Sequence, residues 1–442
     1  MLQFGTDGIR GDADADLTSD LVVALGRAAA VVLGRDRPFI VGRDTRRSGP
    51  RLRDDLAAGL HAEGAVLHDA GVLPTPGLAF VAAEAGAPAL MISASHNPWT
   101  DNGIKLFAPG GRKLDDATER RVEDELRARV GATGAGAAGV DGTHPHDTYV
   151  DHLLGTLDGR RLDGLRVVLD CANGAASELG PDVMRALGAD VVVLHAAPDG
   201  TNINAGCGST APGDLQAAVV AERADAGLAF DGDADRVLAV DEHGTLVDGD
   251  QIIVVTALDL HARGALRNGA VAVTVMSNLG LRQALEPAGV HIVETPVGDR
   301  QVLAAMDAGD LVLGGEQSGH VIFRDLATTG DGILTGLQLL DCVARAQRPL
   351  SELAAQMAHV PQLLESVRVR TRGADLSAAP TLAAEVAAVE AELGDSGRVL
   401  VRPSGTEPLI RIMVEAPTEA TARAALARLR RVTETELGLP PA

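Results

Sequence analysis

Three stretches of the chain repeat one local pattern: an apolar run, then a short polar or glycine-containing turn, then apolar residues at helical spacing. They lie at residues 38–49, 166–174 and 271–280. Buried parallel strands are typically continuous apolar runs, whereas an amphipathic helix has apolar residues every three or four positions. Each stretch therefore predicts an α/β unit with its own sheet. The similarity between them is too weak to define a sequence repeat.

The domain organisation follows from length and from breaks in this pattern. A chain of 442 residues is too long for a single hydrophobic core. A Gly/Ala run at 131–139 predicts a linker or loop, and further boundaries are expected near 247–250 and 360–366. The C-terminal part alternates Val and Arg before a helix–strand–helix pattern, which indicates a small α+β domain. The expected domains are 1–145, 146–249, 250–362 and 363–442.

Composition excludes several classes of protein. A net charge of −22 argues against a nucleic-acid surface, which needs clustered basic residues. The three cysteines are far apart in the sequence and odd in number, so we expect no disulfide framework and a reducing cytoplasm. No apolar run reaches the roughly 18 residues of a membrane span. A polar motif begins at residue 4, so we expect no signal peptide.

The segment at residues 91–105 gathers reactive side chains after an apolar, strand-like run. Ser95, His96 and Lys105 lie within it. Lys105 is one of two lysines among 39 basic residues, so this chain generally uses arginine where only a positive charge is needed. An ammonium can lose its proton near neutral pH, whereas a guanidinium cannot. The loop is therefore expected to carry chemistry; the alternative is a polar surface loop with a chance lysine.

An acidic triplet lies between two apolar runs at residues 226–240. Asp231, Asp233 and Asp235 alternate, so on an extended backbone they project from the same side. Their mutual repulsion favours a bound cation, and oxygen-only ligands indicate Mg²⁺ first, with Mn²⁺ or Ca²⁺ as alternatives. An EF-hand loop would need glycine where Arg236 stands. A solvated acidic turn is the remaining alternative, which the apolar flanks disfavour.

Four further turns carry polar side chains. At 402–411 two arginines flank a Ser-Gly-Thr turn whose hydroxyls and N–H groups suit an anion, although an ordinary tight turn is the alternative. The glycine-rich turn at 314–320 offers Glu316, Ser318 and His320 to hydroxyls or an amine, although His320 suits a structural role equally well. Turns at 5–10 and 295–300 each contain an arginine.

Taken together, these motifs resemble those of the α-D-phosphohexomutase superfamily. The segments 5–10, 93–98, 231–236, 315–320 and 402–408 occur in the family's order. The resemblance implies an α/β fold of three related α/β domains with mixed sheets and a smaller C-terminal α+β domain, around a central cleft. In chain order, the domains would carry a phosphoserine loop, a metal-binding loop, a sugar-recognition loop and a phosphate-binding site.

The resemblance also implies roles for individual residues. Ser95 would carry a phosphoryl group, and Asp231, Asp233 and Asp235 would hold Mg²⁺ together with an oxygen of the phosphorylated Ser95. Lys105 would be the general base, with a pKa lowered by burial or nearby cations. Arg236 would stabilise developing charge, and His96 would assist or orient the loop. The expected substrate-binding residues are Arg10, Asp299, Arg300, Glu316, Ser318 and His320. The expected phosphate-binding residues are Arg402, Ser404, Gly405, Thr406 and Arg411.

Within the superfamily, the turns at 297–300 and 316–320 resemble those of bacterial phosphoglucosamine mutases. This implies that glucosamine 6-phosphate and glucosamine 1-phosphate are interconverted through a hexose 1,6-bisphosphate, which also activates the enzyme. The product would supply amino-sugar nucleotide and cell-wall precursor synthesis. The nearest alternative is a phosphomannomutase/phosphoglucomutase. A metal-dependent sugar phosphatase and a sugar-phosphate sensor are alternatives from other classes. The expected partner is a small-molecule hexosamine phosphate, with no nucleic acid and no membrane; a homodimer is a candidate assembly.

Overall fold

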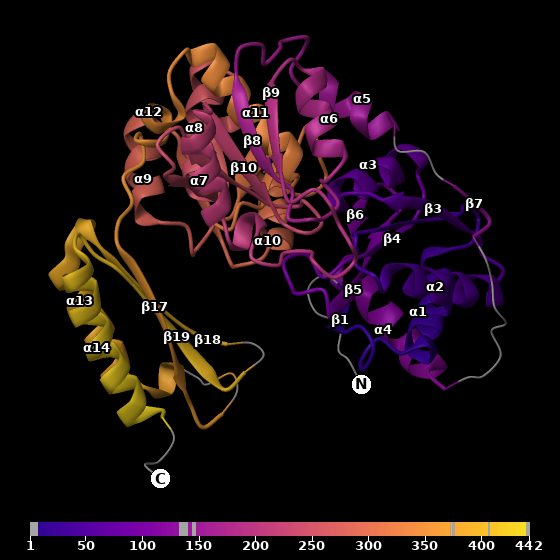
Figure 1. The fold of residues 1–442 in the computed structure, drawn as a ribbon. Helices are drawn as coiled ribbons and strands as arrows, with labels where there is room; N and C mark the ends of the chain where they lie inside the picture. Colours follow the sequence, from indigo (N-terminus) through magenta and orange to yellow (C-terminus); the bar gives the residue numbers. More distant parts are fainter. Residues whose placement is uncertain are drawn as a thin grey trace. The chain divides into compact units, whose positions relative to one another are not determined.

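The computed structural model describes residues 8–131, 140–143, 147–371, 373, 376–404 and 407–438. The chain divides into two compact units, Met1–Met276 with Gly289–Gln356 and Ser277–Ala288 with Met357–Ala442. Figure 1 draws both units and labels many of their helices and strands. The described residues form four sheets, of which three lie in the first unit.

The first sheet is mixed and has the strand order β1-β5-β4-β2-β3-β7, with β6 beside β5. Strands β2, β3 and β4 run parallel, while β5 is antiparallel to both β1 and β4. The strands are β1 Ile9–Asp12, β2 Phe39–Arg43, β3 Leu67–Val72, β4 Ala89–Ile92, β5 Asp101–Ala108, β6 Arg112–Lys113 and β7 Gly142–Thr143. The helices are α1 Ser19–Leu33, α2 Gly49–Ala62, α3 Thr75–Ala85 and α4 Asp116–Arg129, and α1 packs against α2 and α4 (Figure 1).

The second sheet has the order β12-β11-β10-β8-β9. Its strands are β8 Arg166–Asp170, β9 Asp190–Leu194, β10 Ala226–Phe230, β11 Val237–Asp241 and β12 Leu246–Val247. The associated helices are α5 Asp147–Gly155, α6 Leu179–Ala186 and α7 Gly213–Glu222. Strand β10 is parallel to β8 but antiparallel to β11, and all five of its residues are buried. The turn between β10 and β11 therefore follows the buried central strand of the sheet, and it carries the acidic triplet.

The third sheet has the order β14-β13-β15-β16, with β13 parallel to β14 and β15 antiparallel to β16. Its strands are β13 Ala270–Thr274, β14 His291–Thr295, β15 Leu313–Gly315 and β16 Val321–Phe323. Its helices are α8 Gly249–Ala262, α10 Asp299–Gly309, α11 Gly332–Ala346 and α12 Leu350–Ala354. Asp248 and Gln251 form a capping box at the start of α8. The side chain of each residue accepts a hydrogen bond from the backbone N–H of the other.

The second unit is an antiparallel sheet, β17-β19-β18, with two long helices. Its elements are β17 Gln362–Arg368, β18 Arg398–Pro403, β19 Leu409–Glu415, α13 Pro380–Leu393 and α14 Glu419–Glu436. Its own core includes Ile410, Ile412 and Leu429. The prediction of three α/β domains with mixed sheets followed by a smaller α+β domain is confirmed.

One helix packs with residues that are far from it in the sequence. Helix α9, Leu279–Leu285, lies within the range expected for the third domain but groups with the C-terminal unit. The amide of Asn278 donates to Val360 O at 2.8 Å, and Leu279 N donates to the buried carboxylate of Glu415 at 2.9 Å. The chain therefore enters the second unit twice, which local sequence patterns did not reveal.

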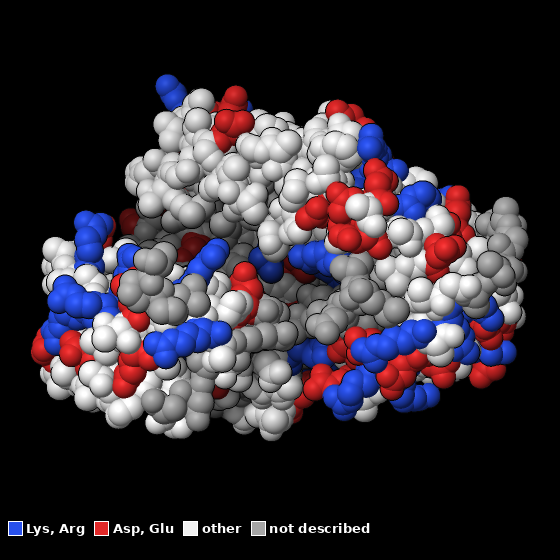
Figure 2. Space-filling model, turned by 90° about the horizontal axis from the view of Figure 1, so that it is seen from below, with Lys and Arg blue, Asp and Glu red and all other residues white. Residues whose placement is uncertain are grey.

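Charged side chains of both signs lie on the surface of the molecule. On the face shown in Figure 2, acidic and basic side chains are interspersed, and the described residues there form no continuous basic surface. Among the described helices, none is both long enough and apolar enough to cross a membrane.

Candidate active site

Ser95 follows the fully buried strand β4 and has a left-handed backbone, with φ of 53°. Ser95 is only 3% exposed. Its N–H donates to Ser93 Oγ at 2.9 Å, and Ser93 Oγ donates in turn to Asp44 Oδ2 at 2.6 Å. A non-glycine residue with positive φ is strained, and such strain persists only where surrounding contacts enforce it. These contacts therefore orient the Ser95 hydroxyl.

Arg46 anchors the loop that carries Ser95. This arginine is 1% exposed, and its Nε donates to Asp44 Oδ2 at 2.8 Å. Its two Nη groups donate to four loop carbonyls, those of Ser95, Asn97, Pro98 and Asp101. All five guanidinium donors are thus used. Sequence reasoning missed Arg46; the available signal was a cluster of charged residues directly after a buried parallel strand.

Ser95 lies against the acidic triplet of the following domain. Ser95 Oγ donates to Asp231 Oδ2 at 2.5 Å, and both residues are buried. A Cβ atom on Gly232 would lie 2.6 Å from Ser95 O, so only glycine allows this approach. The structure therefore brings together two motifs that the sequence separates by 136 residues.

The three aspartates fit a divalent cation. One carboxylate oxygen from each lies within 4.8 Å of the others. Asp233 Oδ1 and Asp235 Oδ1 are buried and have no hydrogen-bond partner in the part of the chain that the structure describes. Burial and the neighbouring carboxylates raise the pKa of Asp231 well above its usual range. Unpartnered, mutually repelling oxygens are what a hard cation such as Mg²⁺ would satisfy.

Lys105 lies on β5, 3% exposed, with Nζ 2.7 Å from Asp233 Oδ2 and 3.4 Å from Asp235 Oδ2. We expected burial or nearby cations to lower its pKa, and this stays a prediction. Lys105 is buried, and these two contacts of its ammonium are with carboxylates. Although burial opposes ionisation of Asp235, Lys105 and then His320 hold the pKa of that carboxyl well below its usual range.

His96 and Arg236 flank the serine. His96 Nδ1 is 3.4 Å from Ser95 Oγ, and burial, Arg236 and Arg10 lower the pKa of its imidazole. These surroundings therefore favour the neutral imidazole. Burial opposes ionisation of Arg236, but the aspartates around it raise its pKa. Arg10, expected to bind substrate, contributes positive charge at His96.

The glycine-rich turn places its three polar residues differently. Glu316 Oε1 accepts the Gly298 N–H at 3.1 Å, while Ser318 is exposed. His320 is 3% exposed, and its Nε2 accepts the Gly330 N–H at 3.0 Å. Its Nδ1 lies 3.8 Å from Asp235 Oδ2. His320 is thus buried next to Asp235 of the acidic triplet, whereas Glu316 and Ser318 are more accessible to solvent.

Asp299 and Arg300 are both engaged in ion pairs. Asp299 pairs with Lys113, the second lysine of the chain, and the pKa of its carboxyl is lowered despite burial. Arg300 donates to Asp116 and Glu119 of the first domain at 2.8 Å each. Binding of substrate by Asp299 or Arg300 stays a prediction and would require these pairs to open.

In the second unit, Arg402 on β18 and Arg411 on β19 lie directly opposite each other. Neither has an acidic partner among the described residues, and burial and Arg411 lower the pKa of Arg402. Like charges opposed across strands are unfavourable, so a bound anion would stabilise the pair. The nearby Ser404 is buried and its Oγ accepts the Glu407 N–H at 3.3 Å. The predicted residues Gly405 and Thr406 lie outside the described residues.

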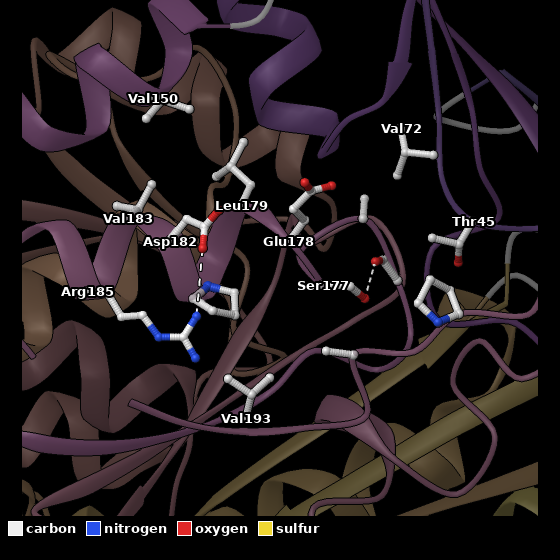
Figure 3. A pocket seen from close by; sticks show the side chains of 15 residues that line it. Thr45, Val72, Val150, Ser177, Glu178, Leu179, Asp182, Val183, Arg185 and Val193 are labelled. Carbon is white, nitrogen blue, oxygen red and sulfur yellow. Dashed lines mark hydrogen bonds and ion pairs between the residues drawn. The ribbon is translucent and has the colours of Figure 1, made fainter. Parts of the chain in front are cut away.

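One sizeable cavity does not coincide with these groups. It measures about 690 Å³ and is lined from both the first and second domains, as Figure 3 shows. Thr45 Oγ1 donates to Asn173 O at 2.5 Å beside it, and Asp182 pairs with Arg185 in its wall. Neither Ser95 nor any of the three aspartates lines it. We therefore identify the candidate active site from the arrangement and charge of its side chains, and not from this cavity.

Four domain families match nearly the whole chain. Their descriptions are phosphoglucomutase/phosphomannomutase alpha/beta/alpha domain I at residues 1–130, domain II at 147–244, domain III at 248–360, and the C-terminal domain at 364–432.

Individual proteins match over similar lengths. The phosphoglucosamine mutase of Frankia alni is 53% identical over 454 residues, and that of Thermobifida fusca is 52% identical over 452 residues; each alignment covers 99% of both chains. The crystal structure of a phosphoglucomutase/phosphomannomutase family protein from Burkholderia thailandensis has a TM-score of 0.81 at 26% identity, covering 99% of this chain and 98% of that one.

Proposed function

This chain belongs to the phosphoglucomutase/phosphomannomutase family, and from that premise we propose that it interconverts glucosamine 6-phosphate and glucosamine 1-phosphate. It is a phosphate-transferring isomerase. The observation that carries the proposal is the hydrogen bond from Ser95 Oγ to Asp231 inside a buried cluster of three carboxylates. The sugar is proposed from the relatives at 53% and 52% identity that are named phosphoglucosamine mutases.

The proposed phosphoryl carrier is Ser95. A phosphoryl group on Oγ would replace the proton that now bonds to Asp231, placing a dianion beside three carboxylates. Mg²⁺ would be held by an oxygen on Ser95 together with Asp231, Asp233 and Asp235. When bound, this ion would neutralise the charge that develops during phosphoryl transfer. Arg236, next to the aspartates, would add to that stabilisation.

In the first transfer, a free hydroxyl of the sugar phosphate attacks phosphorus and the bond from phosphorus to Ser95 Oγ breaks. The hydroxyl loses a proton and Ser95 Oγ gains one. Lys105 is the predicted acceptor, and the imidazole of His96 lies 3.4 Å from Ser95 Oγ. These two residues are therefore the proposed proton-exchange groups. A pH–rate profile that loses its acidic limb in Lys105→Arg but not in His96→Gln would assign the acceptor to Lys105, because a base works only once it has lost its proton.

The second transfer reverses the first at the other end of the sugar. The 1,6-bisphosphate turns round and returns its other phosphate to Ser95, which releases the isomeric product. A site for the non-reacting phosphate must accept either end, and the opposed Arg402 and Arg411 are proposed for it. The carboxylate of Glu316 is proposed to favour the ammonium at carbon 2 over a hydroxyl.

We propose a cytoplasmic location, since the three cysteines are unpaired and buried. A homodimer stays a prediction, which light scattering of the purified protein would test.

The decisive assay measures turnover with Mg²⁺ and a trace of hexose 1,6-bisphosphate. We expect glucosamine 6-phosphate to be preferred over glucose and mannose phosphates, and Ser95→Ala to be inactive. A preference for glucose or mannose phosphate would keep the mechanism and change the sugar. Net release of inorganic phosphate with activity retained in Ser95→Ala would instead indicate a phosphatase.

A further inference from the structure

Thr75 of the first domain is fully buried and contacts the acidic loop of the second. It is the first residue of α3, where helix N–H groups have no partner within the helix. Its N–H donates to Asp233 O at 2.9 Å, and its Oγ1 donates to Asp233 Oδ2 at 2.5 Å. Both donors of one threonine are thus used on one aspartate, 158 residues away in the sequence.

These bonds determine which oxygen of Asp233 is left available. Oδ2 receives both Thr75 Oγ1 and Lys105 Nζ, the latter at 2.7 Å. A carboxylate oxygen offers about two acceptor positions, so Oδ2 is saturated. Oδ1 is buried and has no hydrogen-bond partner among the described residues. The carboxylate is therefore held with Oδ1 as its free ligand atom.

We propose that Thr75 is a positioning residue for the cation site: it holds the main chain and the carboxylate of Asp233 so that Oδ1 faces the cation. This inference rests on the proposed Mg²⁺ site. Groups that orient metal ligands typically change metal affinity 10- to 100-fold when they are removed. Without the Thr75 hydroxyl, Lys105 would be left to restrain Oδ2 of Asp233. The carboxylate could then rotate about that contact.

The side-chain and main-chain contributions can be separated by substitution. Thr75→Val keeps the shape and the backbone N–H but removes the hydroxyl. Thr75→Ser keeps the hydroxyl and removes a methyl group. Thr256→Val is a matched control, because Thr256 is 1% exposed and its hydroxyl bonds only within α8, to Ile252 O at 2.7 Å and Ile253 O at 3.2 Å.

The experiment is titration of the purified full chain with Mn²⁺, followed by electron paramagnetic resonance of the free ion. We expect Kd to rise about 10- to 100-fold in Thr75→Val and to stay within about threefold of wild type in Thr75→Ser and Thr256→Val. The Mg²⁺ concentration for half-maximal turnover should rise by the same factor in Thr75→Val.

Wild-type affinity in Thr75→Val would overturn the inference, and so would equal losses in Thr75→Val and Thr75→Ser, which would indicate a packing role. If Thr75→Val does not fold, Thr75→Ala removes the same hydroxyl and is measured in the same way. Absence of Mn²⁺ binding by the wild-type chain would instead contradict the proposed cation site itself.

Discussion

Gly232 shows how one residue determines the contact between two domains. It separates Asp231 from Asp233, and its Cα faces the carbonyl of Ser95. A methyl group there would meet backbone, which cannot move aside as a flexible side chain can. The absence of a side chain therefore lets the acidic loop approach the serine.

We predict that Gly232→Ala lowers turnover at least 100-fold, because the new Cβ would lie 2.6 Å from Ser95 O and would separate Ser95 from Asp231. Turnover under saturating Mg²⁺ is the measurement. Gly213→Ala is the control, since a Cβ there has nothing within 4 Å and should leave turnover unchanged. Equal turnover in the two variants would contradict the prediction.

A second residue-scale prediction concerns Asp331, the N-cap of α11. Burial raises the pKa of its carboxyl from 3.8 to about 6, against the opposing effects of the Leu334 N–H and the Tyr149 hydroxyl. The folded state therefore keeps this proton to higher pH than the unfolded state. Stability is lost as pH rises from about 4 to 6, by roughly 3 kcal/mol.

The side chain in Asp331→Asn cannot ionise. The free energy of unfolding of this variant should therefore increase relative to that of wild type as the pH rises from 4 to 7. Urea unfolding at several pH values measures this difference. Tyr149→Phe removes a donor to the ionised form and should steepen the loss instead. Parallel stability curves for all three proteins would show that Asp331 does not titrate in this window.

At the scale of the element, the loop after β4 is held by side chains from outside it, chiefly that of Arg46. Its carbonyls at four positions converge on the guanidinium of Arg46, which pairs with the buried Asp44. The Asn204 amide, from the second domain, also donates to Ser95 O at 2.9 Å. The conformation of the serine loop is thus determined by donors outside the loop.

We predict that Arg46→Lys destabilises the protein by about 3 kcal/mol or more and lowers turnover, because an ammonium cannot reach both Asp44 and the carbonyls. Urea unfolding gives the stability. The single tryptophan, Trp99, lies in this loop and its emission reports the loop's environment. Arg35→Lys, at an exposed ion pair, should stay within about 0.5 kcal/mol. Unchanged stability and emission in Arg46→Lys would refute the anchoring role.

At the scale of the whole molecule, the proposed cation site lies entirely in the first of the two compact units. A ligand that binds only the folded state stabilises the unit that binds it, by about 2.7 kcal/mol at a concentration 100-fold above Kd. The second unit has its own core and should not respond.

Removal of Mg²⁺ by a chelator should therefore lower the unfolding temperature of the first unit and leave that of the second unchanged. Differential scanning calorimetry with and without Mg²⁺ tests this. Asp233→Asn should abolish the shift, since it removes a ligand charge. A shift that survives in Asp233→Asn, or that appears in both transitions, would place the ion elsewhere.

The sequence alone determined the class of the fold and indicated where the chemistry of this protein lies. Apolar runs followed by turns predicted three α/β units, and the alternation of Asp231, Asp233 and Asp235 predicted a cation site. The α/β units are confirmed and the cation site stays a prediction; both could be inferred because strand burial, turn chemistry and carboxylate repulsion depend on residues close together in the chain.

Tertiary structure alone decided which groups meet. No local pattern indicated that Arg46 would hold the serine loop, that Thr75 would bind Asp233, or that Lys105 would lie between carboxylates rather than cations. Nor did any pattern place α9 with the C-terminal unit. Such contacts join segments that are far apart in the sequence, and they arise from how the sheets and helices pack, which local spacing does not encode.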